Sequence, residues 1–242
     1  MASSLVRPRK RRRKFSSGVS LCHCDLALRS ESCLVGSQKA GYTLLAVETR
    51  AISKSVLKIP EQRQSTGNSN SGPLKRLTIV LDNQDNLDGL KVKMTRLFQY
   101  DILSVLPTDE NTFIYACEKM VDVDIITLDA SNGLNFHLNH SAVTTAVARG
   151  LTFELQYSDA FSSLTSRKHF LVTAMRIIDA TRGGKHLIFS SGASKDMHLR
   201  RPHDIMNLGK LCGIKKDEYA SGILCKYPHE AIEHGRRRHE KL

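Results

Sequence analysis

The strongest constraint on the fold is a repeated alternation of short apolar runs with helical patterns between residues 76 and 191. The apolar runs start 22 to 34 residues apart, so each interval leaves room for one helix and two loops. Each run is four or five residues long and rich in Ile, Val, Leu or Phe, as expected of strands buried on both faces. The runs are Leu77–Leu81, Ile102–Leu106, Asp124–Leu128, Thr152–Leu155 and His186–Phe189, and Thr43–Val47 is an earlier one.

The segments between the runs carry the marks of amphipathic helices. Apolar residues recur at helical spacing within Phe113–Met120, after Asp109 as a capping residue, and within Ala142–Val147 and Phe170–Ile178. Alternating strands and helices predict right-handed βαβ units around a parallel sheet. An open doubly wound sheet and a closed barrel both fit this pattern. The single-domain length and the lack of a Gly-rich phosphate loop favour an α/β, TIM-barrel-like (β/α) barrel.

The 242 residues, 40% of them apolar, suit one barrel domain, which we place at residues 19–232. Residues 1–18 are basic and Ser-rich and are expected to be disordered, and 233–242 are expected to form a basic C-terminal tail. A flexible loop is predicted at 60–73, where Ser, Asn, Gly and Pro cluster. Residues 29–40 are too few for a full helix after the first strand, so the first βα unit is expected to be incomplete. No apolar run approaches the roughly 18 residues of a membrane helix.

Basic residues are concentrated in a few segments of a chain whose net charge is +12. Such patches bind polyanions through phosphate contacts, although a purely solvated surface is the alternative. The N-terminal block predicts nuclear import or nonspecific RNA binding and consists of Arg9, Lys10, Arg11, Arg12, Arg13 and Lys14. The internal patch predicts RNA-binding residues Arg182, Lys185, Lys195, Arg200 and Arg201.

The segment Ser190–Gly209 is the most informative part of this patch. It follows a buried strand, combines small residues with three cations, and enters a helix near Pro202. Backbone N–H groups and arginines there could grip RNA phosphates, whereas the alternative is a loop that caps the barrel with solvated cations. The chain has no Trp, so we expect recognition of RNA shape and backbone rather than of bases.

Polar residues at the predicted strand ends are candidate catalytic or metal-binding groups. Carboxylates around one rim could bind a metal ion or act as acid and base, but they also commonly cap the following helix. No His or Cys pair at metal-ligand spacing accompanies them, so we predict neither a catalytic residue nor a metal site nor a cofactor. The candidates are Glu48, Asp82, Asp129, Glu154, Ser190 and Ser191.

Cys22-His23-Cys24 is a second candidate metal site. A zinc site needs four ligands, and no second pair is evident in the sequence. The alternation across Val19–Leu28 suits a strand with buried thiols equally well, so we expect no metal there. The six scattered cysteines are expected to be buried thiols rather than disulfides. The C-terminal histidines, which lie among arginines, are expected to be exposed: His229, His234 and His239.

Four ordered stretches resemble the thirty-kilodalton protein subunit family of ribonuclease P/MRP, and the resemblance extends from about Asp25 to His234. Two positions depart from that family, with Arg201 in place of Gly and His203 in place of the usual Tyr. The stretches are Val121–Asp129, the segment starting ARGLTFELQY at Ala148, His186–Ala193 and Leu199–Gly213.

This resemblance implies a TIM-barrel-like subunit without a catalytic site, in a particle whose RNA removes the 5′ leader of precursor tRNA. Its implied partners are RNase P/MRP RNA, a small ferredoxin-like subunit and other RNase P/MRP proteins. Contact with precursor tRNA is implied to be indirect, and no membrane partner is implied. The implied location is the nucleus and nucleolus, with a role in rRNA processing as well. Two alternatives stay open: a barrel metallo-phosphoesterase using the rim carboxylates, and a protein-interaction barrel that meets RNA only through its neighbours.

Overall fold

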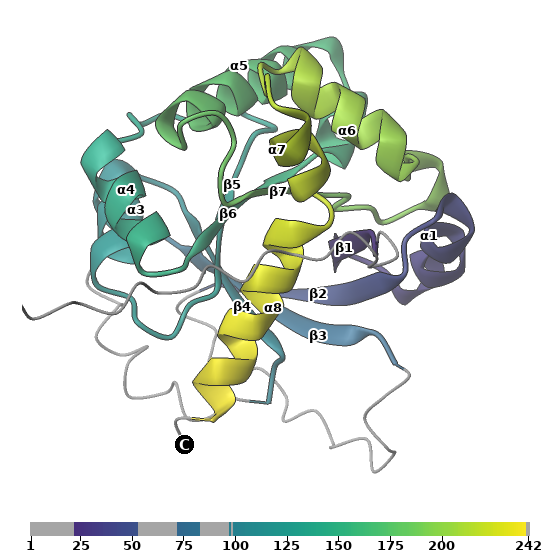
Figure 1. The fold of residues 1–242 in the computed structure, drawn as a ribbon, viewed down its shortest axis with the longest axis horizontal. Coiled ribbons are helices and arrows are strands. Elements are labelled where there is room, and N and C mark those ends of the chain that lie inside the picture. Colours follow the sequence, from purple (N-terminus) through teal and green to yellow (C-terminus); the bar gives the residue numbers. More distant parts are fainter. Residues whose placement is uncertain (1–21, 53–71, 83–96, 98, 241–242) are drawn as a thin grey trace, which may run out of the picture.

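The computed structural model describes residues 22–52, 72–82, 97 and 99–240. Its described strands form one seven-stranded parallel sheet in the order β1 to β7, with helices packed around it (Figure 1). The strands are β1 (Cys24–Leu28), β2 (Leu44–Ile52), β3 (Leu74–Leu81), β4 (Ile102–Pro107), β5 (Ile125–Leu128), β6 (Thr152–Gln156) and β7 (Leu187–Ser190). The α-helices are α1 (Leu34–Ala40), α3 (Glu110–Glu118), α4 (His140–Ala148), α5 (Leu164–Ala180), α6 (Pro202–Leu211), α7 (Asp217–Gly222) and α8 (Lys226–His239). Three 3-10 turns are η1 (Glu31–Cys33), η4 (Ser158–Phe161) and η5 (Asp196–His198).

The predicted apolar runs are all strands, which confirms the parallel α/β architecture. Strands β4 to β7 are buried along their whole length because helices cover their outer faces. Strand β3 begins at Leu74, three residues before the predicted run, and so takes in the charged residue Arg76. That extension places a guanidinium inside the barrel.

The predicted helices begin at side-chain caps. Asp109 accepts a hydrogen bond from the Thr112 backbone N–H at 2.9 Å, and together they form a capping box at the start of α3. Asn139 and Ser163 cap α4 and α5 in the same way. These caps satisfy amide groups that the first helical turn leaves without intrahelical partners.

The sheet curls until its two outer strands meet, which gives a nearly closed barrel. The Arg29 N–H donates to the Ala193 carbonyl at 2.9 Å, and the Ser191 N–H donates to Asp25 Oδ1 at 2.9 Å. The first βα unit is present but short, as expected, because residues 29–40 form only η1 and the seven-residue α1. The TIM-barrel-like prediction is therefore confirmed, with seven described strands.

Helix α8 crosses the amino ends of the strands and closes that end of the barrel, as its position in front of the sheet shows (Figure 1). Gly235 allows the close approach, because a Cβ there would collide with the Asp101 carbonyl oxygen. An apolar layer fills the space between α8 and the barrel interior at the amino ends of the strands. Its buried residues are Cys24, Leu26, Ala46, Ile102, Ile125, Ile188, Tyr227, Ala231 and Ile232.

The expected C-terminal tail from residue 233 is therefore corrected, since α8 continues to His239 and belongs to the folded domain. Arg238 is 4% exposed and pairs with buried Asp124. His234 also reaches Asp124, so its predicted exposure is wrong, and His229 and His239 are partly buried. The many charged residues of this segment are typical of a solvated tail, so the sequence did not indicate a packed helix. In the structure Arg238 and His234 pair with Asp124 inside the molecule.

Two predicted segments lie outside the described residues: the N-terminal tail 1–18 and most of the loop 60–73, of which only Gly72 and Pro73 are described. Within the described part of the chain, no helix combines the length and the apolar character needed to span a membrane.

Candidate nucleic-acid interface

The centre of the barrel holds a buried ion pair between Arg76 of β3 and Glu154 of β6. Arg76 Nη1 donates to Glu154 Oε1 at 2.5 Å, Nη2 donates to the second carboxylate oxygen, and both side chains are fully buried. Burial alone would raise the pKa of Glu154, but the charge and hydrogen bonds of Arg76 outweigh it and lower that pKa. The carboxylate is therefore held ionised by a fixed positive charge.

The remaining donors of Arg76 are also satisfied, so the pair is locked in place. Each of these donors reaches a hydroxyl or carbonyl of β1, β3, β4 or β5 at 2.8 to 3.1 Å. The acceptors are Thr78 Oγ1, Leu26 O, Ser104 Oγ and Thr127 Oγ1. Strand alternation brings these groups to one interior layer, because every second residue of a strand points to the same face.

Above this layer the barrel opens at the carboxyl ends of the strands into a pocket of about 250 Å³. Arg50 Nη2 and Arg29 Nη2 both donate to Gln156 Oε1, at 2.6 and 2.8 Å. Arg50 also lies 3.2 Å from Glu48, whose side chain is fully buried below it. The pocket is lined by Arg29, Arg50, Leu106, Thr127, Leu128, Asp129, Ala130, Ser131, Gln156 and Ser162.

The rim carboxylates do not assemble into a shared metal site. Glu48 and Glu154 flank Arg76, whose Nη2 lies 3.7 Å from Glu48 Oε1. Asp129 accepts hydrogen bonds from the backbone and hydroxyl of Ser131, at 2.9 and 2.5 Å. Asp82 is exposed at the end of β3. A guanidinium thus occupies the centre where a barrel metalloenzyme would gather its carboxylates around an ion.

The hydroxyls at the end of β7 are likewise engaged in structure. Ser190 Oγ donates to Glu154 Oε1 at 2.6 Å. Ser191 Oγ donates to the Ala27 carbonyl and accepts a hydrogen bond from the Ala193 N–H. Neither hydroxyl has a histidine base beside it in these contacts, so the arrangement does not match an activated nucleophile.

Three of the five internal candidate cations lie on the loop after β7, at the carboxyl end of the barrel. Lys195 and Arg201 are exposed, and Arg200 is half-buried. The Arg200 guanidinium lies 4.4 Å from the ring centroid of Phe161, and its Nη1 donates to the carbonyls of Met197 and Leu199 at 2.9 and 2.8 Å. Arg200 therefore shapes the loop while its side chain stays partly exposed.

Arg182 and Lys185 lie at the other end of the barrel, so the predicted internal patch is not one surface. Both are exposed in the turn between α5 and β7, before the strand rather than after it. The four-residue strand β7 separates them from Lys195 by roughly 13 Å of strand length alone. Arg182 and Lys185 are close to Lys195 in sequence, but β7 runs between them and places them at opposite ends of the barrel. The N-terminal candidates, Arg9 to Lys14, fall outside the described residues.

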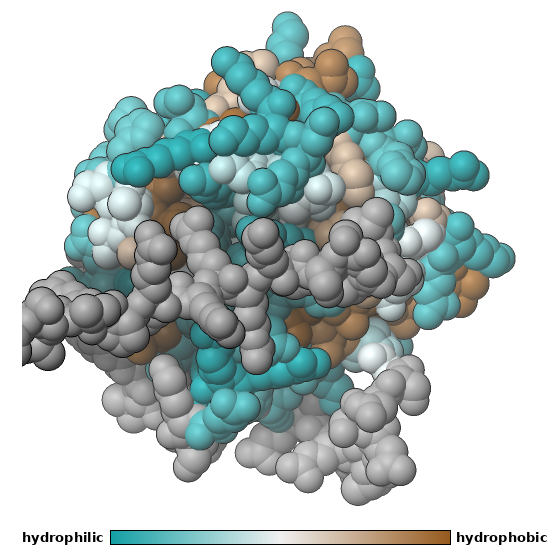
Figure 2. Space-filling view, in the orientation of Figure 1, coloured by the Kyte–Doolittle hydropathy of each residue, from teal (hydrophilic) through white to brown (hydrophobic). Residues whose placement is uncertain are grey.

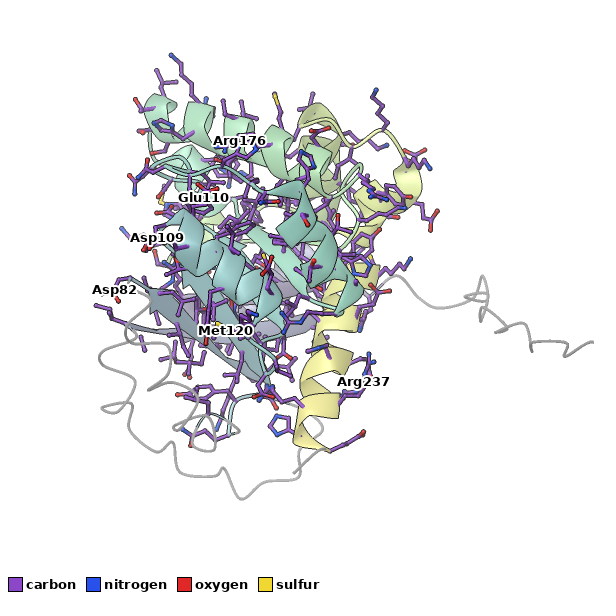
Figure 3. The ribbon with its side chains drawn as sticks, turned by 90° about the vertical axis from the view of Figure 1, so that its left-hand side faces the viewer. Asp82, Asp109, Glu110, Met120, Arg176 and Arg237 are labelled. Carbon is purple, nitrogen blue, oxygen red and sulfur yellow. The ribbon has the colours of Figure 1, made fainter. Side chains whose placement is uncertain are left out.

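Charge is unevenly distributed between the two ends. The β3 to β5 side of the carboxyl end carries Asp82, Asp109 and Glu110, whereas Arg237 of α8 lies at the opposite end (Figure 3). The loop after β7 lies beside the end of β1 and helix α1, where the Arg29 N–H donates to Ala193 and Asp196 lies next to Gly36. Where the described atoms are visible from the side of α8, teal hydrophilic residues predominate, with brown apolar patches between them (Figure 2). Exposed cations thus occur at both ends of the barrel, with Lys195 and Arg201 on the loop after β7 and Arg237 on α8.

The interior arginines escaped sequence analysis. Arg76 stands next to an apolar run, and Arg29, Arg50 and Gln156 lie at strand ends without a recognisable motif. The available signal was the period of two, because positions 48 and 50, 76 and 78, and 154 and 156 are all polar. That pattern marks a polar face, although it does not say whether the face points into a barrel.

Comparison with known proteins gives a consistent family match. Residues 27–240 match the family model described as RNase P subunit p30. The mouse ribonuclease P protein subunit p30 is 33% identical over 150 residues, covering 62% of this chain and 55% of that protein. The Arabidopsis thaliana protein GAMETOPHYTE DEFECTIVE 1 is 37% identical over 148 residues, covering 61% of this chain and 25% of that protein. The chain thus spans about half the length of the mouse relative and a quarter of the plant one.

A solved structure shares the fold. A chain in the cryo-EM structure of an archaeal ribonuclease P with mature tRNA superposes with a TM-score of 0.61 over 90% of this chain and 92% of that chain. The identity is 14%, so this likeness bears on the barrel architecture.

Proposed function

Since this chain belongs to the RNase P subunit p30 family, we propose that it acts as a protein subunit of ribonuclease P and leaves cleavage to the RNA. In that role it helps the RNA subunit remove the 5′ leader of precursor tRNA. The single observation that carries the non-catalytic part of the proposal is Arg76, which occupies the barrel centre between Glu48 and Glu154. Carboxylates that are neutralised by a buried guanidinium are poor ligands for a catalytic cation.

The rim loop after β7 supplies the RNA contacts in this proposal. Lys195 and Arg201 are exposed, and Arg200 is held by Phe161 and partly exposed. Phosphate contacts of this type position a protein on nucleic acid without reading its bases. The partners would be RNase P RNA, a small ferredoxin-like subunit and other subunits, with precursor tRNA contacted indirectly.

The proposed location is the nucleus, including the nucleolus, with RNase MRP and rRNA processing as a second setting. The basic block Arg9–Lys14 supports import, because such a run of cations has the composition of a nuclear-localisation signal.

The test is a cleavage assay with purified full-length chain and precursor tRNA, with and without Mg²⁺. We expect no product from the chain alone and association with RNase P RNA when bound RNA is sequenced after affinity purification. Turnover by RNA-free protein that disappears in Asp82→Ala or Asp129→Ala would overturn the proposal and favour the metallo-phosphoesterase.

One observation favours a second candidate, the interaction barrel that meets RNA only through its neighbours. Arg200 donates two hydrogen bonds to carbonyls of its own loop. Such contacts fix the shape of the loop, as expected of a residue that supports a docking surface for another protein. RNA crosslinking in the assembled particle separates the two roles, because only a direct contact crosslinks at Lys195 or Arg201.

A further inference from the structure

Two segments far apart in sequence bring sulfur and imidazole ligands together at the amino end of β1. Cys22 and Cys24 enter the strand, and Cys225 and His229 begin helix α8. The Cys24 backbone N–H donates to the Leu224 carbonyl at 2.8 Å, so the fold itself holds the two segments together. The sequence shows the first pair plainly, but the second pair lies some two hundred residues later in the chain.

Three of these side chains lie close enough together to share one metal ion. Cys24 Sγ lies 3.7 Å from His229 Nε2, and the ligand atoms of Cys22, Cys24 and His229 all lie within 4.8 Å of one another. Zinc bonds of about 2.3 Å to sulfur and about 2.0–2.1 Å to nitrogen, at a tetrahedral angle, put those two atoms roughly 3.6 Å apart. The distance between Cys24 Sγ and His229 Nε2 is therefore already close to that of two ligands bound to one zinc ion.

Cys225 is the candidate fourth ligand: its Sγ lies outside the 4.8 Å group formed by the other three, so its side chain must rotate to reach a shared ion. It precedes His229 by four residues at the start of α8, so the two side chains project from the same face of the helix. Their i, i+4 spacing is the same as that of the two zinc-binding histidines of a helical His-Glu-x-x-His motif.

His23 does not belong to the set. It alternates to the other side of the strand, where its ring packs against His203 with centroids 6.0 Å apart. The pattern at residues 22–24 is thus two thiols on one side with the imidazole on the other, as strand alternation requires.

We infer that Cys22, Cys24, Cys225 and His229 bind a structural Zn²⁺ ion that fastens α8 to the first strand of the barrel. Three thiolates and one imidazole form a closed tetrahedral set, which is the composition of structural rather than catalytic zinc sites. Sulfur ligands favour zinc over Mg²⁺ or Ca²⁺. The inference does not depend on the proposed RNA-related function, because the site lies at the end of the barrel opposite the rim loop.

The first measurement is the metal content of the full-length chain, purified under reducing conditions without chelators from zinc-supplemented medium. We expect one zinc ion per chain. Replacement of zinc by Co²⁺ should give the visible bands of tetrahedral cobalt together with thiolate charge-transfer absorption. The variants Cys225→Ser and His229→Asn should each weaken metal retention by at least roughly 10–100-fold in a chelator competition, the loss associated with disturbing even the groups around a metal site.

The matched control is Cys212→Ser, which removes a buried thiol at the end of α6 outside the cluster and should leave metal content unchanged. Zinc-free wild-type protein after supplementation, or an octahedral cobalt spectrum, would overturn the inference. So would a native Cys22–Cys225 disulfide found by mass spectrometry, since it would mark a redox pair instead. If a ligand variant does not fold, the wild-type stoichiometry and cobalt spectrum decide the question.

Discussion

His234 Nδ1 lies 2.7 Å from Asp124 Oδ1, and Arg238 Nη2 lies 3.1 Å from the other oxygen of the same carboxylate. One buried acid at the start of β5 thus binds two successive turns of α8. The Leu103 N–H also donates to it at 2.9 Å, which ties the carboxylate to β4. The basic end of the chain is held to the barrel by a specific ionic contact rather than left in solvent.

Asp124→Asn should therefore destabilise the protein by about 3 kcal/mol or more, because it leaves the buried Arg238 charge without its counterion. The free energy of unfolding from urea denaturation measures this loss. Glu233→Gln is the matched control, since it breaks an exposed pair with Arg236 and should cost less than about 1 kcal/mol. Equal effects of the two variants would show that α8 does not depend on Asp124.

Arg76→Met should be among the most damaging changes in the barrel, at about 3–5 kcal/mol, because it leaves Glu154 buried and uncompensated. The double variant with Glu154→Gln should recover part of that loss by removing the orphaned charge. Thermal and urea unfolding of both single variants and the double variant give the coupling energy. Lys75→Met, from the other face of β3, is the control. A double variant no more stable than Arg76→Met would contradict the ion-pair explanation.

Asp25 predicts a pH dependence at the seam between β1 and β7. Burial raises the pKa of its carboxyl, so the folded state favours the protonated form. Its contribution to stability is therefore complete below its ordinary pKa of about 3.9 and declines as pH rises through the raised folded value. Asp25→Asn should remove this decline, so its stability relative to wild type should improve from about pH 4 towards neutral pH.

Unfolding free energies across that pH range test the sign. Asp217 offers the opposite case, because its hydrogen bond and charge interaction with Lys210 lower its pKa. Asp217→Asn should therefore lose stability relative to wild type as pH rises. A wild-type profile parallel to that of Asp25→Asn would refute the assignment of Asp25 as a strained buried acid.

Arg200→Ala combined with Arg201→Ala should weaken binding to RNase P RNA and lower the log–log salt slope by up to roughly two units, since each phosphate contact releases about one counterion. Filter binding at several salt concentrations measures both. Lys119→Ala, at the end of α3, and Arg182→Ala with Lys185→Ala, at the amino end of the barrel, are controls. Arg201 is the weaker contributor, because the resembled family has Gly there.

Arg200→Lys separates charge from shape, because Lys keeps the charge but loses the stacking on Phe161 and the forked donors. Lost binding with an unchanged salt slope would mean that Arg200 shapes the loop, which favours the interaction barrel. Identical behaviour of the rim variants and the controls would remove the loop from the RNA interface.

Deletion of residues 1–14 should reduce nuclear accumulation and weaken nonspecific RNA binding, because the segment holds seven cations and no acid. Fluorescence localisation at matched expression and a salt titration measure the two effects. The melting temperature should stay the same. A large drop in it would show that the segment packs on the barrel, and unchanged localisation would remove its import role.

The sequence predicted the barrel because strand and helix signals are local. Apolar runs such as Ile102–Leu106 and caps such as Asp109 determine the elements, and their alternation determines a parallel sheet. The same logic failed where the deciding contacts are between residues distant in sequence. The sequence indicated a solvated cation at Arg238 because its contact with Asp124 joins residues far apart in the chain. It indicated an isolated buried thiol at Cys24 for the same reason, since His229 lies about two hundred residues later.

The interior of the barrel was hidden for a related reason. A period of two shows that Glu154 and Gln156 share a face, but curvature of the sheet decides which face is enclosed. Arg182 and Lys195 show the converse error, because nearness along the chain does not survive a strand that runs from one end of the barrel to the other.

Closure of the barrel by α8 also imposes an order on synthesis. The Leu224 carbonyl, which accepts a hydrogen bond from Cys24 of β1, is synthesised about two hundred residues after that strand. Until then Leu26, Ile102 and Ile188 have no helix beneath them, so the nascent barrel presents an open apolar end. Contacts so distant in sequence slow folding and prolong exposure to aggregation. The apolar end of the barrel therefore stays exposed until α8 has emerged from the exit tunnel.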